Sequence, residues 1–148
     1  MKAVLQRVKS SKVTVEGKVI GQISQGLNIL LGVEDKDEES VVDKFVEKIV
    51  NLRIFSDEEG KMNKSLLDIK GEVLLVSQFT LLADCRKGRR PSYVHAAEPD
   101  KARDLYEKTT KAIRSYGIKT EIGKFGGYMD VDIQNDGPVT IILDSDSI

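Results

Sequence analysis

The sequence GLNILLGV, residues 26–33, is a nearly continuous apolar run with a glycine near each end. Its length suits a β-strand, and an apolar run without alternation is typical of a strand that is covered on both faces. We therefore expect residues 27–33 to form a central strand of a sheet, around which the rest of the chain is arranged.

Upstream of this run, apolar residues recur with a period close to two. Glu16-Gly17-Lys18 interrupts them with turn-forming residues, and the apolar positions are Val4, Val8, Val13, Val15, Val19 and Ile23. Alternation of this kind predicts a strand followed by a hairpin over residues 3–23.

Downstream, the spacing changes to that of helices. Val42, Phe45, Val46 and Ile49 follow the i, i+3, i+4, i+7 pattern, and the acidic stretch 34–39 suits the positive end of a helix dipole. A second helix is predicted to begin near Pro99, whose fixed φ suits a first turn, and to stop at Gly117.

Further strands complete the pattern. They are predicted at 53–55, before a turn at 57–60, and at 72–82, 118–122, 129–133 and 139–143. Gly126-Gly127 and Asn135-Asp136-Gly137-Pro138 separate the last three, and the second of these reads by default as a tight turn. Two main helices among strands in irregular order predict an α+β fold with a mixed or antiparallel sheet, in a single domain of residues 1–148.

Composition and charge narrow the function classes. The 148 residues carry 23 Lys and Arg against 24 Asp and Glu, so a net charge of −1 gives no general attraction to nucleic acid or to an anionic membrane. The single Cys85 cannot close a disulfide within the chain, and one histidine, His95, is too few for a Cys/His zinc site. No membrane helix or secretory signal is evident, so we expect a cytoplasmic protein.

Polar residues end the apolar strand predicted at 72–82, where Ser77-Gln78-Phe79-Thr80-Leu81 replaces the expected aliphatic residues. Such a strand end can present hydroxyls and main-chain N–H groups to a ligand, including donors for a developing oxyanion. The alternative is a strand that leaves the core with Ser77 and Thr80 bonded to neighbouring backbone, and spacing alone favours this plainer interpretation.

Four cations occur within five residues at Arg86-Lys87-Gly88-Arg89-Arg90. A loop is the natural place for such a cluster, and clustered Lys and Arg neutralise phosphates. The residues leave two interpretations open, a contact for a polyphosphate and a solvated basic loop.

Other constellations are weaker. Asp130 and Asp132 share a strand face, but without a histidine or a third carboxylate they predict no metal site. His95 could act as a general base, yet nothing orients it toward a nucleophile. The Gly137-Pro138 bond could be cis, an isomer that the sequence does not assign.

Over its whole length, the chain resembles the D-aminoacyl-tRNA deacylase family of the bacterial and eukaryotic type. The most specific pieces are Ser77-Gln78-Phe79-Thr80-Leu81 and Asn135-Asp136-Gly137-Pro138-Val139-Thr140, supported by Arg7, Lys87-Gly88 and Arg90-Pro91-Ser92. The resemblance implies hydrolysis of the ester that joins a D-amino acid to the terminal adenosine of tRNA. It also implies activity on glycyl-tRNA, including glycine mischarged on alanine tRNA, and it implies no cofactor and no metal.

The resemblance further implies a barrel-like homodimer with a shared pocket. Gly137 and Pro138, joined by a cis bond, would enter the partner's pocket beside the catalytic residues Ser77, Gln78, Phe79 and Thr80. The residues that would face tRNA are Arg7, Arg86, Lys87, Arg89 and Arg90.

A mechanism follows from this implied arrangement. Carbonyls of Gly137 and Pro138 would accept hydrogen bonds from the substrate ammonium, so that an L side chain would strike the backbone. Because the ester is already activated, the main-chain N–H groups of Phe79 and Thr80 would suffice as oxyanion donors, with Ser77 and Gln78 shaping the pocket. A covalent role for the Thr80 hydroxyl is the competing mechanism.

Two other functions stay open. A non-catalytic tRNA- or rRNA-binding module would use residues 86–90 and leave aminoacyl esters intact. A general small-ester hydrolase would depend on His95.

Overall fold

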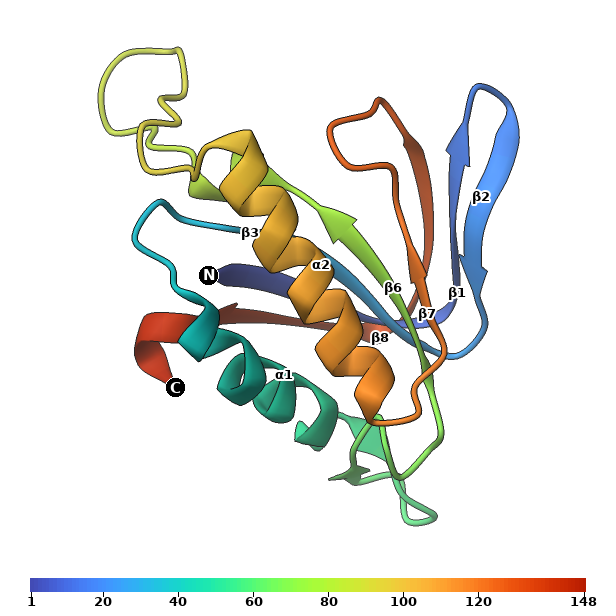
Figure 1. Cartoon of the computed structure of the whole chain (residues 1–148). Coiled ribbons are helices and arrows are strands. Elements are labelled where there is room, and N and C mark those ends of the chain that lie inside the picture. The colour runs from blue at the N-terminus through green and yellow to red at the C-terminus, as the bar shows by residue number, and fades with distance from the viewer.

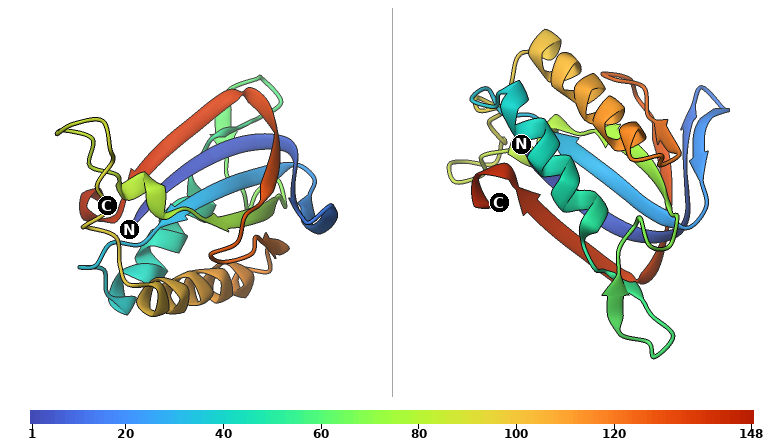
Figure 2. Two further views of the ribbon diagram at one scale, coloured as in Figure 1. Left: turned by 90° about the horizontal axis from the view of Figure 1, so that it is seen from above. Right: turned by 60° about the horizontal axis from the view of Figure 1, so that its bottom comes forward.

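The computed structural model describes all residues, Met1–Ile148, as a curved mixed sheet with two helices on one face (Figures 1 and 2). β1 (Lys2–Val15) organises the sheet because three strands pair with it. On one edge it pairs antiparallel with β3 (Gly26–Gly32) and then with β2 (Lys18–Ile23), and on the other edge with β8 (Asp130–Asp144). β6 (Glu72–Ser77) continues the sheet parallel to β3, and β7 (Thr120–Ile122) is parallel to β6. The predicted mixed sheet is confirmed.

The predicted hairpin is also confirmed. Glu16 and Gly17 connect β1 to β2 with φ values of 49° and 76°. Positive φ at both central residues is what a two-residue hairpin turn of matching twist requires.

Both predicted helices are present, as α1 (Val42–Asn51) and α2 (Pro99–Ser115). Pro99 occupies the first turn of α2, where its missing N–H costs no hydrogen bond. Neither helix is long and apolar enough to cross a membrane. The smaller elements are β4 (Phe55–Ser56), β5 (Met62–Lys64) and short 3₁₀ segments at Glu39–Val41 and Ser145–Ser147; β5 was not predicted.

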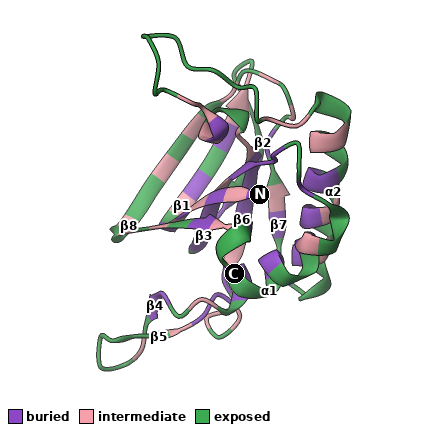
Figure 3. Cartoon of the chain, turned by 90° about the vertical axis from the view of Figure 1, so that its left-hand side faces the viewer, coloured by how far each residue is buried: buried purple, intermediate pink, exposed green.

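Two hydrophobic clusters hold these layers together. The larger one lies between the sheet and the helices and includes Leu27, Ile29 and Leu31 of β3. The smaller one lies on the opposite face of the sheet and consists of Val8, Val13, Ile23, Leu74 and Val76. β3 is buried along almost its whole length, as Figure 3 shows, so its prediction as a central strand is confirmed.

The predicted strand 72–82 is too long. β6 ends at Ser77, and Phe79–Leu82 form a 3₁₀ turn. The N–H of Gln78 donates to Leu31 O at 2.8 Å, after which the chain leaves the sheet. Leu82 is buried within the turn, so its apolar side chain extended the strand pattern past the real strand end.

The predicted division of residues 129–143 into two strands is wrong, because β8 is continuous. Val8 pairs with Asn135 and Gln6 pairs with Thr140, so the segment 136–139 faces Arg7 alone as a bulge. Bulge residues lack regular ladder bonds, so a proline without an N–H is tolerated there. The glycine and proline thus mark a bulge within a strand and do not form a turn.

Candidate active site

A cavity of about 550 Å³ opens at the end of β6. The end of β3, the segment before α2, the first turn of α2 and the β7–β8 connection enclose it, and these segments lie at one end of the molecule in Figure 1. Its lining is mostly apolar and consists of Val33, Val76, Ser77, Gln78, Phe79, Ala96, Ala97, Pro99, Ala102, Phe125, Gly126, Gly127, Tyr128, Met129 and Val131. The size and lining are typical of a site for a small molecule.

Residues 77–80, the floor segment, supply the polar groups of this candidate cavity. Three of them, Ser77, Gln78 and Phe79, line it directly. Phe79 and Thr80 begin the 3₁₀ turn, and the first N–H groups of such a turn have no acceptor within it. The Gln78 side-chain amide donates to the Thr80 hydroxyl, which holds both side chains together. The floor segment therefore offers main-chain donors beside an ordered amide and hydroxyl.

Aromatic rings flank the floor. The Phe79 ring is about half exposed and meets Tyr93 edge to face at a centroid distance of 5.0 Å. Across the cavity, Phe125 packs at 5.8 Å from Tyr106, and the Arg103 guanidinium lies 4.7 Å from the centre of the Phe125 ring. Flat apolar walls of this kind suit a planar ring system such as a nucleobase.

The wall formed by the β7–β8 connection was missed by the sequence analysis. The sequence pattern predicts only a separator at Gly126-Gly127, whereas Phe125, Tyr128 and Met129 around it all line the cavity. A signal was available, since the chain has only four Phe and four Tyr and two of these eight flank the glycine pair.

Tyr106 is hydrogen-bonded to β6 just before the floor segment. Its hydroxyl donates to Leu75 O at 2.7 Å, two residues before the floor segment begins. Burial raises the pKa of Tyr106 to about 12, so the hydroxyl remains a donor across the physiological range.

Gly137 and Pro138 lie in the bulge of β8, and the peptide bond between them is cis. Arg7 holds this bulge, because its Nε donates to Asp136 O at 3.1 Å and lies 3.2 Å from Asp136 Oδ2. Arg7 Nη1 also donates to Ile54 O at 2.7 Å. Arg7 is only 9% exposed, and this geometry favours a positioning role over direct contact with tRNA.

A single chain does not bring the two predicted motifs together. Leu31 of β3 pairs with Ser77 of β6 and with Ala3 of β1, so Ser77 and Ala3 lie at the same level of the sheet. The bulge that contains Gly137 lies opposite Arg7 of β1. Four residues along β1 separate these levels by about 13 Å. Gly137 and Pro138 are absent from the lining of the candidate cavity.

The basic loop, residues 86–90, is exposed and lies outside the cavity lining. Arg86 is paired within the loop region, with Nε 2.9 Å from Asp84 Oδ1 and Nη2 2.6 Å from Oδ2. This pairing holds the pKa of Asp84 well below its usual range. Lys87, Arg89 and Arg90 form no ion pair, so three cations are free to meet an anion.

The remaining predicted side chains lie apart from the candidate cavity. His95 and Cys85 are exposed and line a different, shallow hollow. Carboxylates of Glu34, Asp144 and Asp146 approach within 4.8 Å of one another, but Lys36 is ion-paired with two of them. This lysine already supplies a positive charge to the acidic cluster.

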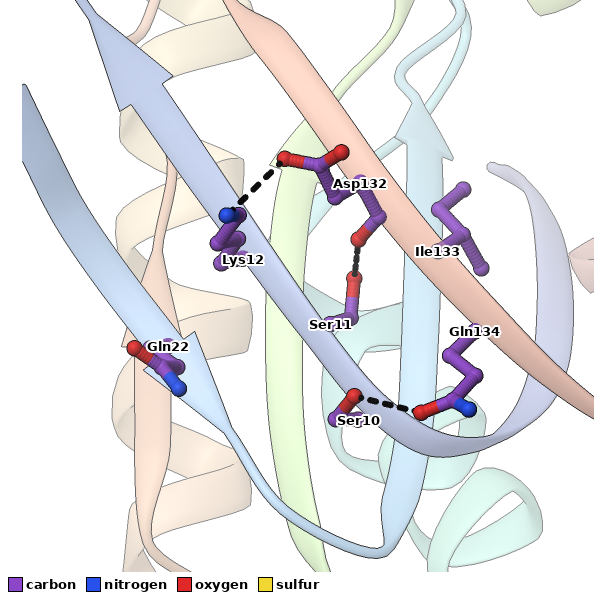
Figure 4. Close-up of a pocket in the computed structure, with 7 residues that line it drawn as sticks. All are labelled: Ser10, Ser11, Lys12, Gln22, Asp132, Ile133 and Gln134. Atoms are coloured by element: carbon purple, nitrogen blue, oxygen red, sulfur yellow. Dashed lines mark hydrogen bonds and ion pairs between the residues drawn. The ribbon is translucent and has the colours of Figure 1, made fainter. Parts of the chain in front are cut away.

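A second cavity of about 480 Å³ lies over β1 and β8 and is lined mainly by polar side chains (Figure 4). Ser10 donates to Gln134 at 3.0 Å, Ser11 donates to Asp132 O at 2.7 Å, and the Lys12 ammonium lies 3.6 Å from Asp132. These groups satisfy one another across the two strands. The hollow thus lacks the apolar walls of the cavity at β6.

Comparisons with known proteins identify the family of the chain. A sequence profile of the family described as "D-Tyr-tRNA(Tyr) deacylase" matches residues 4–144. The D-aminoacyl-tRNA deacylase of Aquifex aeolicus (strain VF5) is 58% identical over 148 residues, which cover 100% of both chains. That of Thermosipho africanus (strain TCF52B) is 57% identical over 148 residues, 100% of this chain and 99% of the relative.

Two solved structures share the fold. One, titled "c-Myc DNA Unwinding Element Binding Protein", has a TM-score of 0.91 and 43% identity and covers 97% of this chain and 98% of its own. The other, described as a probable eukaryotic D-amino acid tRNA deacylase, has a TM-score of 0.83 at 17% identity over 96% and 97% of the two chains, which supports the fold alone. The fold and its relatives define an enzyme of the ester hydrolase class. Within that class, the chain belongs to the D-aminoacyl-tRNA deacylase family.

Proposed function

We propose that this protein hydrolyses the ester bond of D-aminoacyl-tRNA and releases the free D-amino acid and tRNA. The observation that carries the proposal is the candidate cavity, which combines apolar aromatic walls with main-chain donors at its floor. The terminal adenosine fits the apolar walls, and the ester carbonyl fits the floor segment. The names of the full-length relatives agree with this substrate.

The chemistry needs little from side chains. Water attacks the ester carbonyl carbon, the developing oxyanion is held by the N–H groups of Phe79 and Thr80, and the bond to the ribose oxygen breaks. The proton of the water passes to the ribose oxygen, which leaves as a hydroxyl. No His, Cys, Lys, Arg, Asp or Glu lines the cavity, so orientation and electrostatic stabilisation are the main sources of rate.

Selection between D and L substrates is assigned to a second copy of the chain. Gly137 and Pro138 are exposed, lie on the long strand β8 and are far from the cavity of their own chain. On the same strand the apolar side chain of Ile142 is 76% exposed, and a partner packed against β8 would cover it. In a homodimer, main-chain carbonyls of Gly137 and Pro138 would bind the substrate ammonium in the partner's cavity. An L side chain would then collide with the backbone, whereas glycyl-tRNA would be accepted because glycine has no side chain.

The direct experiment compares two esters. D-tyrosyl-tRNA should be hydrolysed with multiple turnovers, and L-tyrosyl-tRNA should remain intact beyond its spontaneous decay. Equal rates for the two would contradict the chiral assignment, and no hydrolysis of either would overturn the proposed function.

Thr80 distinguishes the two mechanisms. Thr80→Val removes the hydroxyl but keeps the main-chain N–H, so we expect kcat on D-tyrosyl-tRNA to fall less than about tenfold. A covalent role for the hydroxyl predicts a loss of at least about a thousandfold. Single-turnover kinetics, with substrate binding measured in parallel, separates these outcomes.

A non-catalytic RNA-binding module is the second candidate function. It is favoured by the free cations Lys87, Arg89 and Arg90 of the basic loop. This function predicts salt-sensitive binding of tRNA with both tyrosyl esters left intact. The same two-ester experiment therefore decides between the candidates.

A further inference from the structure

Tyr128 lies at the rim of the candidate cavity and is 92% exposed, more than any other large apolar or aromatic side chain. An aromatic ring left in water gives up the stabilisation that burial would provide. Beside a cavity, such a ring offers a flat face on which a planar ligand can stack.

The connection that carries Tyr128 is tightly folded. Gly126 has a φ of 69°, and the Gly127 N–H donates to Lys124 O at 3.0 Å. The N–H of Lys124 in turn lies 3.1 Å from Met129 Sδ. These bonds fix both ends of the turn, so the backbone that carries the exposed Tyr128 is held in a preorganised position.

Two cations belong to the segments that enclose the cavity. Arg103 is exposed and stacks at 4.7 Å on Phe125, a wall of the cavity, and Lys124 is exposed on the same connection as Tyr128. Neither residue forms an ion pair, so both guanidinium and ammonium are available to an anion. An aromatic ring beside free cations is the combination that binds a base together with its phosphate.

We propose that Tyr128 stacks on the base of the nucleotide that precedes the terminal adenosine, with Arg103 and Lys124 near its phosphate. This inference rests on the proposed function, which places the terminal adenosine inside the cavity. The single-stranded RNA must then leave the candidate cavity across its rim, where Tyr128 lies. Stacking on one ring tolerates any base, so this contact adds affinity for the RNA end without reading its sequence.

The test compares a substrate with the preceding nucleotide and one without it. Tyr128→Ala, Tyr128→Phe and wild type are assayed on D-tyrosyl-tRNA and on D-tyrosyl-adenosine. We expect Tyr128→Ala to lower kcat/KM for the tRNA at least about fivefold more than for the adenosine ester, mainly through KM. Tyr128→Phe should restore the ratio, and Tyr116→Ala, which removes an exposed tyrosine far from the cavity, should not change it.

Arg103→Gln provides a second, independent measurement. Loss of one phosphate contact should reduce the slope of log KM against log salt for D-tyrosyl-tRNA by about 0.7. The slope for D-tyrosyl-adenosine should be unaffected, because that substrate carries no phosphate.

Three results would overturn the inference. They are an equal loss on both substrates, no loss on either, and a changed oligomeric state of Tyr128→Ala, which would place Tyr128 at a subunit contact. If wild type cleaves neither substrate, the proposed function fails separately. In that case the binding of a labelled CCA trinucleotide tests the stacking contact. Tyr128→Ala must weaken this binding at least about fivefold for the proposal to hold.

Discussion

Arg7 illustrates how burial decides the role of a charged residue. In the sequence it is one of several cations, but in the structure its guanidinium joins Ile54 O, after α1, to Asp136 in the bulge of β8. A lysine keeps the charge but lacks the planar fork that serves both acceptors. The residue therefore acts through geometry as much as through charge.

We expect Arg7→Lys to destabilise the protein by about 1–3 kcal/mol, because buried acceptors lose their donors. Urea unfolding at neutral pH measures this change. Lys9→Gln is the matched control, because Lys9 lies on the same strand and is exposed. A variant as stable as wild type would contradict the positioning role.

Tyr106 gives a prediction with a defined pH window. Tyr106→Phe removes the bond to Leu75 O and should cost about 1 kcal/mol at pH 7. The folded pKa is raised to about 12 from an ordinary value of 10.0, so the folded state retains a proton that the unfolded state loses. Stability from this group is therefore complete below pH 10 and declines as the pH rises toward 12.

The measurement is the difference in unfolding free energy between wild type and Tyr106→Phe at pH 8, 10 and 11. That difference should shrink at alkaline pH by an amount on the order of 1 kcal/mol per unit. A difference that stays constant across this range would contradict the assigned pKa direction.

At the scale of elements, the sequence predicts the helices and strands whose hydrophobic pattern is unbroken. β3 and both helices follow from uniform apolar spacing, and the hairpin follows from its turn residues. The strand end at Ser77 did not, because the buried Leu82 continues the apolar pattern inside a 3₁₀ turn. The bulge in β8 did not either, since its existence depends on pairing with Arg7, more than a hundred residues away.

The candidate site also has one part that the sequence predicts and one part that it does not. The floor segment could be predicted because its polar residues interrupt an apolar strand. The opposite wall, with Phe125 and Tyr128, comes from a connection whose position depends on where β7 and β8 join the sheet. Sequence pattern carries no information on that joining, so the wall appears only in three dimensions.

Gly26 lies where the backbones of β3 and β6 approach each other closely. A Cβ added to it would lie 1.9 Å from Glu72 O, at the start of the parallel pairing of β3 and β6. Gly26→Ala should therefore destabilise the protein by several kcal/mol, or prevent folding, because backbone must move. Gly17→Ala is the control for lost glycine, since a Cβ there meets no atom within 4 Å and only its positive φ is strained. Thermal unfolding compares the two.

At the scale of the whole molecule, the shared-site proposal predicts complementation. A chain with a blocked floor, Ser77→Trp, and a chain with a displaced bulge, Gly137→Ala, should each be inactive alone. A mixed dimer would hold one site with both parts intact. Random mixing in equal amounts should thus restore about a quarter of wild-type activity, because half of the dimers are mixed and each has one working site.

The mixture is prepared by joint refolding or co-expression, and each variant alone is the control. No recovery in a sample proven to contain mixed dimers would show that each chain completes its own site. That result would remove the cross-subunit assignment but leave ester hydrolysis untouched.

The pairing of β1 with β8 has a consequence for synthesis. β1 presents one edge to β8 over most of its length, yet Lys2 and its partner Asp144 lie at opposite ends of the chain. At about 5–20 residues per second, translation needs on the order of ten seconds to deliver the partner strand. During that time the edge of β1 is open to wrong pairing. The nascent protein should therefore depend on ribosome-associated chaperones more than a protein whose sheet grows from neighbouring strands.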